Sequence, residues 1–143
     1  MLTGRTLAPG RAFGIALVLG EPLSFWGGVD AASGRVIDGR HPQFGQSLSG
    51  RVLLLPSGRG SSSSSSVLAE SIRSRTAPAA VLFLQGDPIV ALGALVAQEL
   101  YERSLPVVVL SDGDYRSIRT GQEVSVEAGP GDAVVRVGPA NGG

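Results

Sequence analysis

Apolar residues occur along this chain in short continuous runs that Gly, Pro, Ser and Asp separate. Short apolar runs bounded by such residues are typical of buried strands. Near the end of the chain, EVSVEA and AVVRVG flank GPGD in the manner of a hairpin. The expected strands cover residues 11–19, 35–37, 51–56, 77–85, 106–111, 123–128 and 133–138.

Two segments carry apolar residues at helical spacing instead. In VLAESIRSR (67–75), apolar side chains fall on one side and charged side chains on the other. In DPIVALGALVAQELYERSL (87–105), Asp87 has the place of an N-cap residue and Pro88 that of the first helical residue. We therefore expect one helix over each of these two segments.

The order of these elements predicts the fold class. Strands and helices alternate in the middle of the chain between strand-rich ends, which indicates a layered α/β architecture of β/β/α type. A length of 143 residues suffices for one domain with its own core. We expect a single domain over residues 1–138 and a frayed tail over 139–143.

Charge and hydropathy exclude several classes of partner. The 12 basic residues, all Arg, balance 12 acidic residues, so no basic surface for nucleic acid or an anionic membrane is indicated. The N-terminal segment MLTGRTLAPGRAF has no apolar signal core, and no stretch approaches the roughly 18 apolar residues of a membrane span. These features predict a cytoplasmic protein without nucleic-acid or membrane partners.

The chain has no cysteine and a single histidine, His41. This composition excludes disulfides, thiolate nucleophiles and cysteine-ligated metals within the chain. One histidine is also too few for a zinc or iron site of the chain's own. We therefore expect that this chain by itself binds no metal and no cofactor.

The segment PSGRGSSSSSS (56–66) is the main candidate for chemistry. A run of six serines is often a flexible linker, but this one lies between a buried strand and an amphipathic helix within one domain. A strand, a glycine-rich turn, a serine and a helix together present backbone N–H groups and a positive helix end to an anion. Gly58 and Gly60 permit a positive φ, and the first serines can cap the helix.

Three known motifs of similar composition do not fit this turn. A P-loop requires a Gly-Lys-Ser/Thr ending, and the chain has no lysine. The segment matches neither G-x-G-x-x-G nor the nucleophile elbow G-x-S-x-G. What remains is a serine hydroxyl at a helix N-terminus among amide donors, an environment that stabilises negative oxygen.

GRGSSSSS after a strand resembles the small, swivelling domain of the aconitase superfamily, in which a Gly-x-Gly-Ser-Ser turn supplies a catalytic serine base. The closer resemblance is to the small subunit of the aconitase X family. It is carried by EPLSFWGGVD (21–30) with GRVID (34–38), by RVLLLPSGRGSSSSSSVLAE (51–70), and by DPIVALGALVAQELY (87–101) with PVV (106–108). The resemblance implies a single swivelling β/β/α domain.

The same resemblance implies an activity and a partner. Members are dehydratases that act on 5-phosphomevalonate, largely in archaea, or on cis-3-hydroxy-L-proline in bacteria, which yields Δ1-pyrroline-2-carboxylate. The wording SFWGGVD and the Arg-only composition look bacterial and favour hydroxyproline. An iron–sulfur cluster is expected in a cysteine-containing large subunit, without which this chain is expected to be inactive.

The resemblance also assigns roles to residues. Ser61, the first serine after the GRG turn, is the expected base that removes the α-proton, with the later serines in supporting roles. Aconitase has an arginine two places after its base, where this chain has Ser63. The residues expected to contact the hydroxy acid substrate are Gly60, Ser62, Ser63, Ser24, Gly27 and Gly28.

Simpler interpretations of the same residues stay open at this point. The serines can serve only as helix caps, Trp26 can belong to the core with GGVD as a turn, and His41 can be structural. A swivelling domain can also be a phosphocarrier, but His41 is not in a glycine-rich turn at a helix start. A non-catalytic anion-binding or regulatory domain is the remaining alternative.

Overall fold

Four parallel strands form the half of the sheet that positions the serine run. A computed structural model of the chain describes residues 1–58 and 63–140. In it, β3 (Val52–Leu55) is fully buried and pairs in parallel with β2 (Gly10–Val18) on one side and β4 (Ala80–Phe83) on the other. β4 in turn pairs in parallel with β5 (Val107–Val109). A continuous apolar run suits such a strand because both of its faces are covered.

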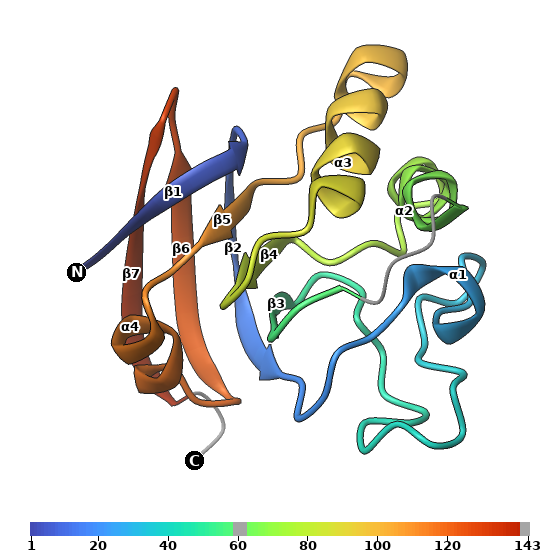
Figure 1. Cartoon of the computed structure of the whole chain (residues 1–143), viewed down its shortest axis with the longest axis horizontal. Helices are drawn as coiled ribbons and strands as arrows, with labels where there is room; N and C mark the ends of the chain where they lie inside the picture. The colour runs from blue at the N-terminus through green and yellow to red at the C-terminus, as the bar shows by residue number, and fades with distance from the viewer. Residues whose placement is uncertain (59–62, 141–143) are drawn as a thin grey trace.

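Antiparallel strands from the two ends of the chain complete a closed barrel. β6 (Gln122–Ala128) pairs with β2, and β7 (Asp132–Ala140) pairs with β6. β1 (Leu2–Ala8) then joins β7 to β5, which gives the order β1-β5-β4-β3-β2-β6-β7 around the barrel (Figure 1).

The strands separate two hydrophobic clusters. Along β3, Val52 and Leu54 face the interior of the barrel, whereas Leu53 and Leu55 face the helices. Helices α2 (Ser63–Arg73) and α3 (Pro88–Tyr101) cover this outer face side by side (Figure 1). The one-turn α1 (Phe25–Gly28) lies beside α2 on this same side. Away from these three helices, α4 (Asp112–Ser117) contributes Tyr115 to the cluster inside the barrel.

This architecture confirms the predicted α/β class, and most of the expected strands and helices are present within a residue or a few of their predicted bounds. The strand expected over 35–37 is wrong: among the described residues this segment makes only isolated bridges, from Val36 to Val29 and from Arg35 to Ser47. The chain between α1 and β3 is instead an irregular loop held by backbone hydrogen bonds such as Leu48 N–H to Gly34 O, 2.8 Å.

Other boundaries differ from the sequence-based expectation. β1 was not expected, because LTGRTLA has no continuous apolar run. SDGD, expected as a turn, begins α4, whose N-cap Ser111 accepts a hydrogen bond from Asp114 N–H. The expected tail over 139–143 is partly ordered, since Ala140 pairs with Gln122 in the β6–β7 ladder.

None of the helices in residues 1–58 and 63–140 has the length and hydropathy that a membrane crossing needs.

Tyr115 of α4 is 6% exposed and lies in the cluster inside the barrel. Its hydroxyl finds no hydrogen-bond partner among the described residues. Burial disfavours the phenolate and raises the pKa of Tyr115 to about 12. The folded chain therefore holds this proton more tightly than the unfolded chain, in which a tyrosine has a pKa of about 10.

We predict that the free energy of unfolding declines as the pH rises from about 10 towards about 12, because the unfolded state loses the Tyr115 proton first. Tyr115→Phe should remove this part of the pH dependence. At neutral pH the variant should be as stable as the parent or up to about 1 kcal/mol more stable, since an unpartnered buried hydroxyl is lost. Urea denaturation of both proteins at about pH 9 and about pH 11 measures the difference. Parallel losses of stability in the two proteins would contradict the assignment.

Candidate active site

The carboxyl ends of the parallel strands meet at one edge of the barrel, and the first residues of the segment that leads to the serine run follow β3 at this edge. Parallel strands in α/β proteins commonly place their ligands at such an edge. Here Ser57 and Gly58 follow β3, and the loop over 84–87 follows β4. These residues line a hollow of about 600 Å³, together with Arg5 of β1.

Gly58 is held at this edge by two close neighbours. It forms a parallel bridge with Leu23 from the loop after β2. A Cβ atom on Gly58 would lie 1.7 Å from Oδ2 of Asp87. Only glycine lets the backbone come this close to the carboxylate, because every other residue carries a Cβ atom. Asp87 Oδ1 accepts a hydrogen bond from Ile89 N–H (2.8 Å), which confirms Asp87 as the N-cap of α3, with Pro88 at its first position.

Ser64, in the first turn of α2, contacts α1 and its N-cap residue Ser24. Its side chain is 3% exposed, and its Oγ lies 3.1 Å from Oγ of Ser24. The same Oγ accepts a hydrogen bond from Trp26 N–H (3.3 Å). The structure thus brings together two segments that were singled out separately from the sequence. The spacing of Ser64, Leu68 and Ile72 at intervals of four residues is the signal that could have identified Ser64 as facing inward.

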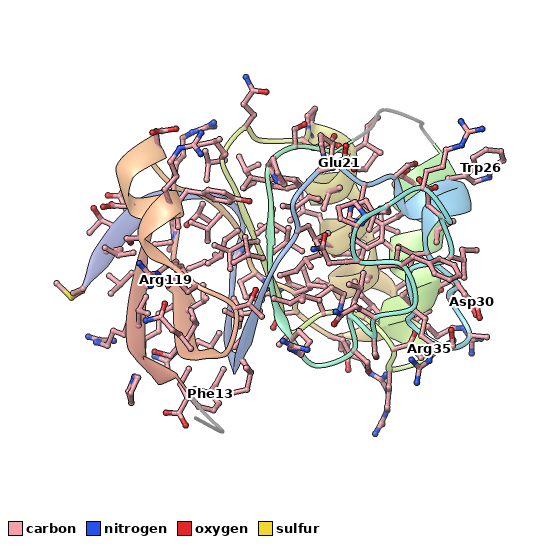
Figure 2. All side chains as sticks on the ribbon, turned by 90° about the horizontal axis from the view of Figure 1, so that it is seen from below. Phe13, Glu21, Trp26, Asp30, Arg35 and Arg119 are labelled. Atoms are coloured by element: carbon pink, nitrogen blue, oxygen red, sulfur yellow. The ribbon has the colours of Figure 1, made fainter. Side chains whose placement is uncertain are left out.

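The loop that Ser64 holds has an unusual backbone. Gly27 adopts φ +80°, in the left-handed region, and is exposed. Gly28 is buried, and a Cβ there would lie 2.9 Å from Cδ1 of Leu23. Trp26, the second residue of α1, is 59% exposed and projects from the outer surface (Figure 2), so the interpretation of Trp26 as a core residue is wrong. An exposed indole beside the serine run is available for contact with another molecule.

The remaining predicted site residues are only partly described. Gly60, Ser61 and Ser62 lie outside the described residues, so their assigned roles stay predictions. Ser63 is the first residue of α2, which begins four positions earlier than expected. The last four serines of the run therefore lie in the helix, and the linker interpretation is wrong for these four.

Asp30 shapes the turn that follows this loop. Its Oδ2 accepts a hydrogen bond from the Ser33 hydroxyl (2.8 Å), and its Oδ1 accepts one from Ala32 N–H (3.2 Å). These hydrogen bonds, the Ser33 hydroxyl first, lower the pKa of Asp30. The carboxylate is therefore used to hold the turn over residues 30–33, on the same side of the molecule as Trp26 and Arg35 (Figure 2).

His41 is buried and both of its ring nitrogens are engaged. Nδ1 accepts a hydrogen bond from Gln43 N–H (3.0 Å), which requires the proton on Nε2, and Nε2 donates to the carbonyl oxygen of Glu21 (3.1 Å). This arrangement supports the structural interpretation of His41.

In the part of the chain that the structure describes, no three His, Cys, Asp or Glu residues are grouped to hold a metal ion. Without cysteine anywhere in the sequence, the donor set does not fit an iron–sulfur cluster.

We predict that Ser64→Ala lowers the free energy of unfolding by about 1 kcal/mol, because Ser24 and Trp26 N–H lose a partner. It should also speed hydrogen exchange of the Trp26 amide. Ser66→Ala is the matched control, since Ser66 is an exposed residue of the same helix. That control should be neutral or slightly stabilising, because alanine is the better helix former. Equal effects of the two substitutions would argue against the contact.

A second prediction concerns the approach of Gly58 to Asp87. Gly58→Ala should force the Asp87 carboxylate away and weaken the cap of α3, at a cost of about 1 kcal/mol or more. The destabilisation by Gly58→Ala should be smaller in an Asp87→Ala background, because the new Cβ atom then has no carboxylate to displace. Gly39→Ala serves as the control, since a Cβ at Gly39 meets no atom within 4 Å. Denaturant titrations of the four proteins of the Gly58–Asp87 cycle and of the control give these values, and strict additivity would contradict the contact.

Comparisons with known proteins agree with this geometry. The model of the aconitase X swivel domain family matches residues 1–136. The crystal structure of Thermococcus kodakaraensis aconitase X in its holo form superimposes with a TM-score of 0.81 at 35% identity, covering 94% of this chain and 97% of that chain. This likeness confirms the swivelling-domain fold.

Two kinds of dehydratase occur among the curated relatives of this chain. A cis-3-hydroxy-L-proline dehydratase of Pseudomonas aeruginosa is 51% identical over 112 residues, 78% of this chain and 19% of that protein. A phosphomevalonate dehydratase small subunit of Methanothermobacter thermautotrophicus is 41% identical over 128 residues, 89% of this chain and 93% of that protein. The chain spans about a fifth of the length of the hydroxyproline dehydratases that it matches. By its family match and these relatives, the chain belongs to the aconitase X swivel domain family.

Proposed function

We propose that this chain is the swivelling subunit or domain of an aconitase X-type hydro-lyase that dehydrates cis-3-hydroxy-L-proline. The observation that carries the proposal is the 51% identity with the P. aeruginosa cis-3-hydroxy-L-proline dehydratase. The geometry is consistent with it. Ser57 and Gly58, which lead into the serine run, lie at the edge where the parallel strands end and line a hollow of about 600 Å³ that admits a small hydroxy acid.

A phosphomevalonate dehydratase is the second candidate. The observation in its favour is that the match to the M. thermautotrophicus small subunit extends over 93% of that protein, so that almost the whole of that small subunit corresponds to this chain. Both candidates are dehydrations of a hydroxy acid. They differ in whether the substrate carries a phosphate in addition to its carboxylate.

In the proposed reaction the deprotonated oxygen of the serine acts as the base. It takes the α-proton of the substrate and becomes a neutral hydroxyl, the bond from the β-carbon to its hydroxyl breaks as a carbon–carbon double bond forms, and the departing hydroxide takes a proton from a general acid and leaves as water. With cis-3-hydroxy-L-proline this step gives an enamine, which tautomerises to Δ1-pyrroline-2-carboxylate. Ser61 is our candidate because it directly follows the GRG turn and precedes the first residue of α2 by two positions. The residues on either side of the turn, Gly58 and Ser64, are each held by the contacts described above.

The proposal requires a partner polypeptide. The name of the M. thermautotrophicus relative contains the words small subunit, and the P. aeruginosa relative is about five times as long as the matched segment. We propose that a cysteine-containing large subunit or domain holds the iron–sulfur cluster, because this chain has no cysteine. The exposed Trp26 beside the serine run is a candidate contact with that partner.

The substitution Ser61→Ala tests the role of the base. In the complex with the large subunit it should lower kcat by about 10²- to 10⁴-fold, the usual effect of losing a general base, while assembly and substrate binding persist. Loss of a capping serine alone would instead lower stability by about 1 kcal/mol and leave the rate nearly unchanged.

Ser66→Ala provides the comparison within the same run and should change kcat only a few-fold. If Ser61→Ala keeps near-parental activity while another serine proves essential, the base is misassigned. If no serine of the run affects the rate, the proposal of a serine base fails, and a non-catalytic anion-binding domain becomes the better interpretation.

A further inference from the structure

Arg5, in the N-terminal strand β1, lies at the same edge of the barrel as Ser57 and Gly58. In the antiparallel β1–β5 ladder, Arg5 stands opposite Val109, which is the last residue of β5. Arg5 is therefore level with the carboxyl ends of the parallel strands. Its guanidinium lies over the loop after β4, where Nη2 is 3.8 Å from the Cβ position of Gly86.

The hollow of about 600 Å³ is lined both by Arg5 and by Ser57 and Gly58, the two residues that lead from β3 into the glycine-serine segment. Of the described residues that line it, Arg5 is the one with a cationic side chain. The acidic side chain in the lining is Asp87, whose Oδ1 is already used to cap α3. Arg5 thus places a positive charge at the point where a bound substrate would meet the edge.

No carboxylate neutralises Arg5 in the part of the chain that the structure describes. The ion pairs there join Arg73 to Glu70, Arg116 to Asp112 and Arg136 to Glu127. Asp132, which faces Arg5 across the β1–β7 ladder, makes no ion pair with it either. By contrast, Arg51 and Arg103 donate to backbone carbonyl oxygens and help to hold the fold.

We propose that Arg5 binds the carboxylate or phosphate anion of the substrate and is a specificity-determining residue of the site. A planar guanidinium matches two oxygens of either group, and such charge-assisted pairs are among the stronger hydrogen bonds in proteins. The inference rests on the proposed function for the identity of the anion, because every hydroxy acid substrate carries a carboxylate. The site itself rests on the position of Arg5 in the hollow.

A purely structural role for Arg5 makes a different prediction. The residue also borders an apolar groove of about 410 Å³ between β1 and α3, lined by Leu7, Leu92 and Leu95, over which its aliphatic part can lie. If packing were its only role, a substitution would change stability without any dependence on anions. The test therefore needs a measurement that responds to anion binding.

In the complex with the large subunit, Arg5→Gln should raise KM for the substrate by about 10- to 100-fold, the effect of losing a charge-assisted hydrogen bond, with kcat changed less. Arg5→Lys, which keeps the charge but not the planar fork, should be intermediate. Arg11→Gln is the matched control, since Arg11 is an exposed arginine of β2 that pairs in register with Glu127, away from the hollow. An active complex in which Arg5→Gln leaves KM within about two-fold of the parent overturns the inference but not the proposed function.

A second measurement does not depend on activity. The side-chain Nε–Hε NMR signals of the 143-residue chain can be followed while cis-3-hydroxy-L-proline or inorganic phosphate is added at constant ionic strength. We expect a saturable shift of the Arg5 signal that exceeds any shift of Arg11 and is absent in Arg5→Gln. A response to hydroxyproline indicates carboxylate binding, and a response to phosphate alone indicates the phosphate of the second candidate substrate. If neither anion shifts Arg5 more than Arg11, the inference is wrong even where the complex is active.

Discussion

The complete burial of β3 on both faces is the constraint on which the site depends. Its side chains alternate between the interior of the barrel and the cluster under α2 and α3, and all four have no exposed surface. A shift of one residue in register would exchange the two sets of side chains and disrupt both clusters. The carboxyl end of β3 is therefore fixed relative to β2 and β4, and the start of the serine turn is fixed with it.

Polar contacts then connect this edge to segments that are distant in the sequence. Gly58 packs against the carboxylate that caps α3, and Ser64 holds the loop before α1 through Ser24 and Trp26. Gly58 and Ser64, on either side of the glycine-serine segment, are thus each held by a residue at the start of another helix, Asp87 of α3 or Ser24 of α1. Preorganisation of this kind is what the proposed serine base would require, because small displacements of a catalytic group reduce catalysis steeply.

The parts of the fold that follow local rules could be predicted from the sequence, and the others could not. The buried run of β3 and the Asp87-Pro88 start of α3 are local signals, and both were predicted correctly. β1 was missed because its partners β5 and β7 are distant in the chain, and its own residues show no apolar run. The contact of Ser24 with Ser64 joins residues 40 positions apart, so no local pattern predicts it. The spacing of Ser64 and Leu68 indicates only that Ser64 faces inward. The role of Ser61 stays a prediction, because it lies outside the described residues.

The central claim is that this chain supplies a serine base, and a partner supplies the metal, in the dehydration of a hydroxy acid. The most direct measurement is an assay of the chain alone, the proposed large subunit alone, and the co-expressed complex. Each preparation is offered cis-3-hydroxy-L-proline and 5-phosphomevalonate side by side. The account predicts loss of water from cis-3-hydroxy-L-proline by the complex and by neither part alone. Turnover by the isolated chain, or a stable complex that leaves both compounds unchanged, would contradict it.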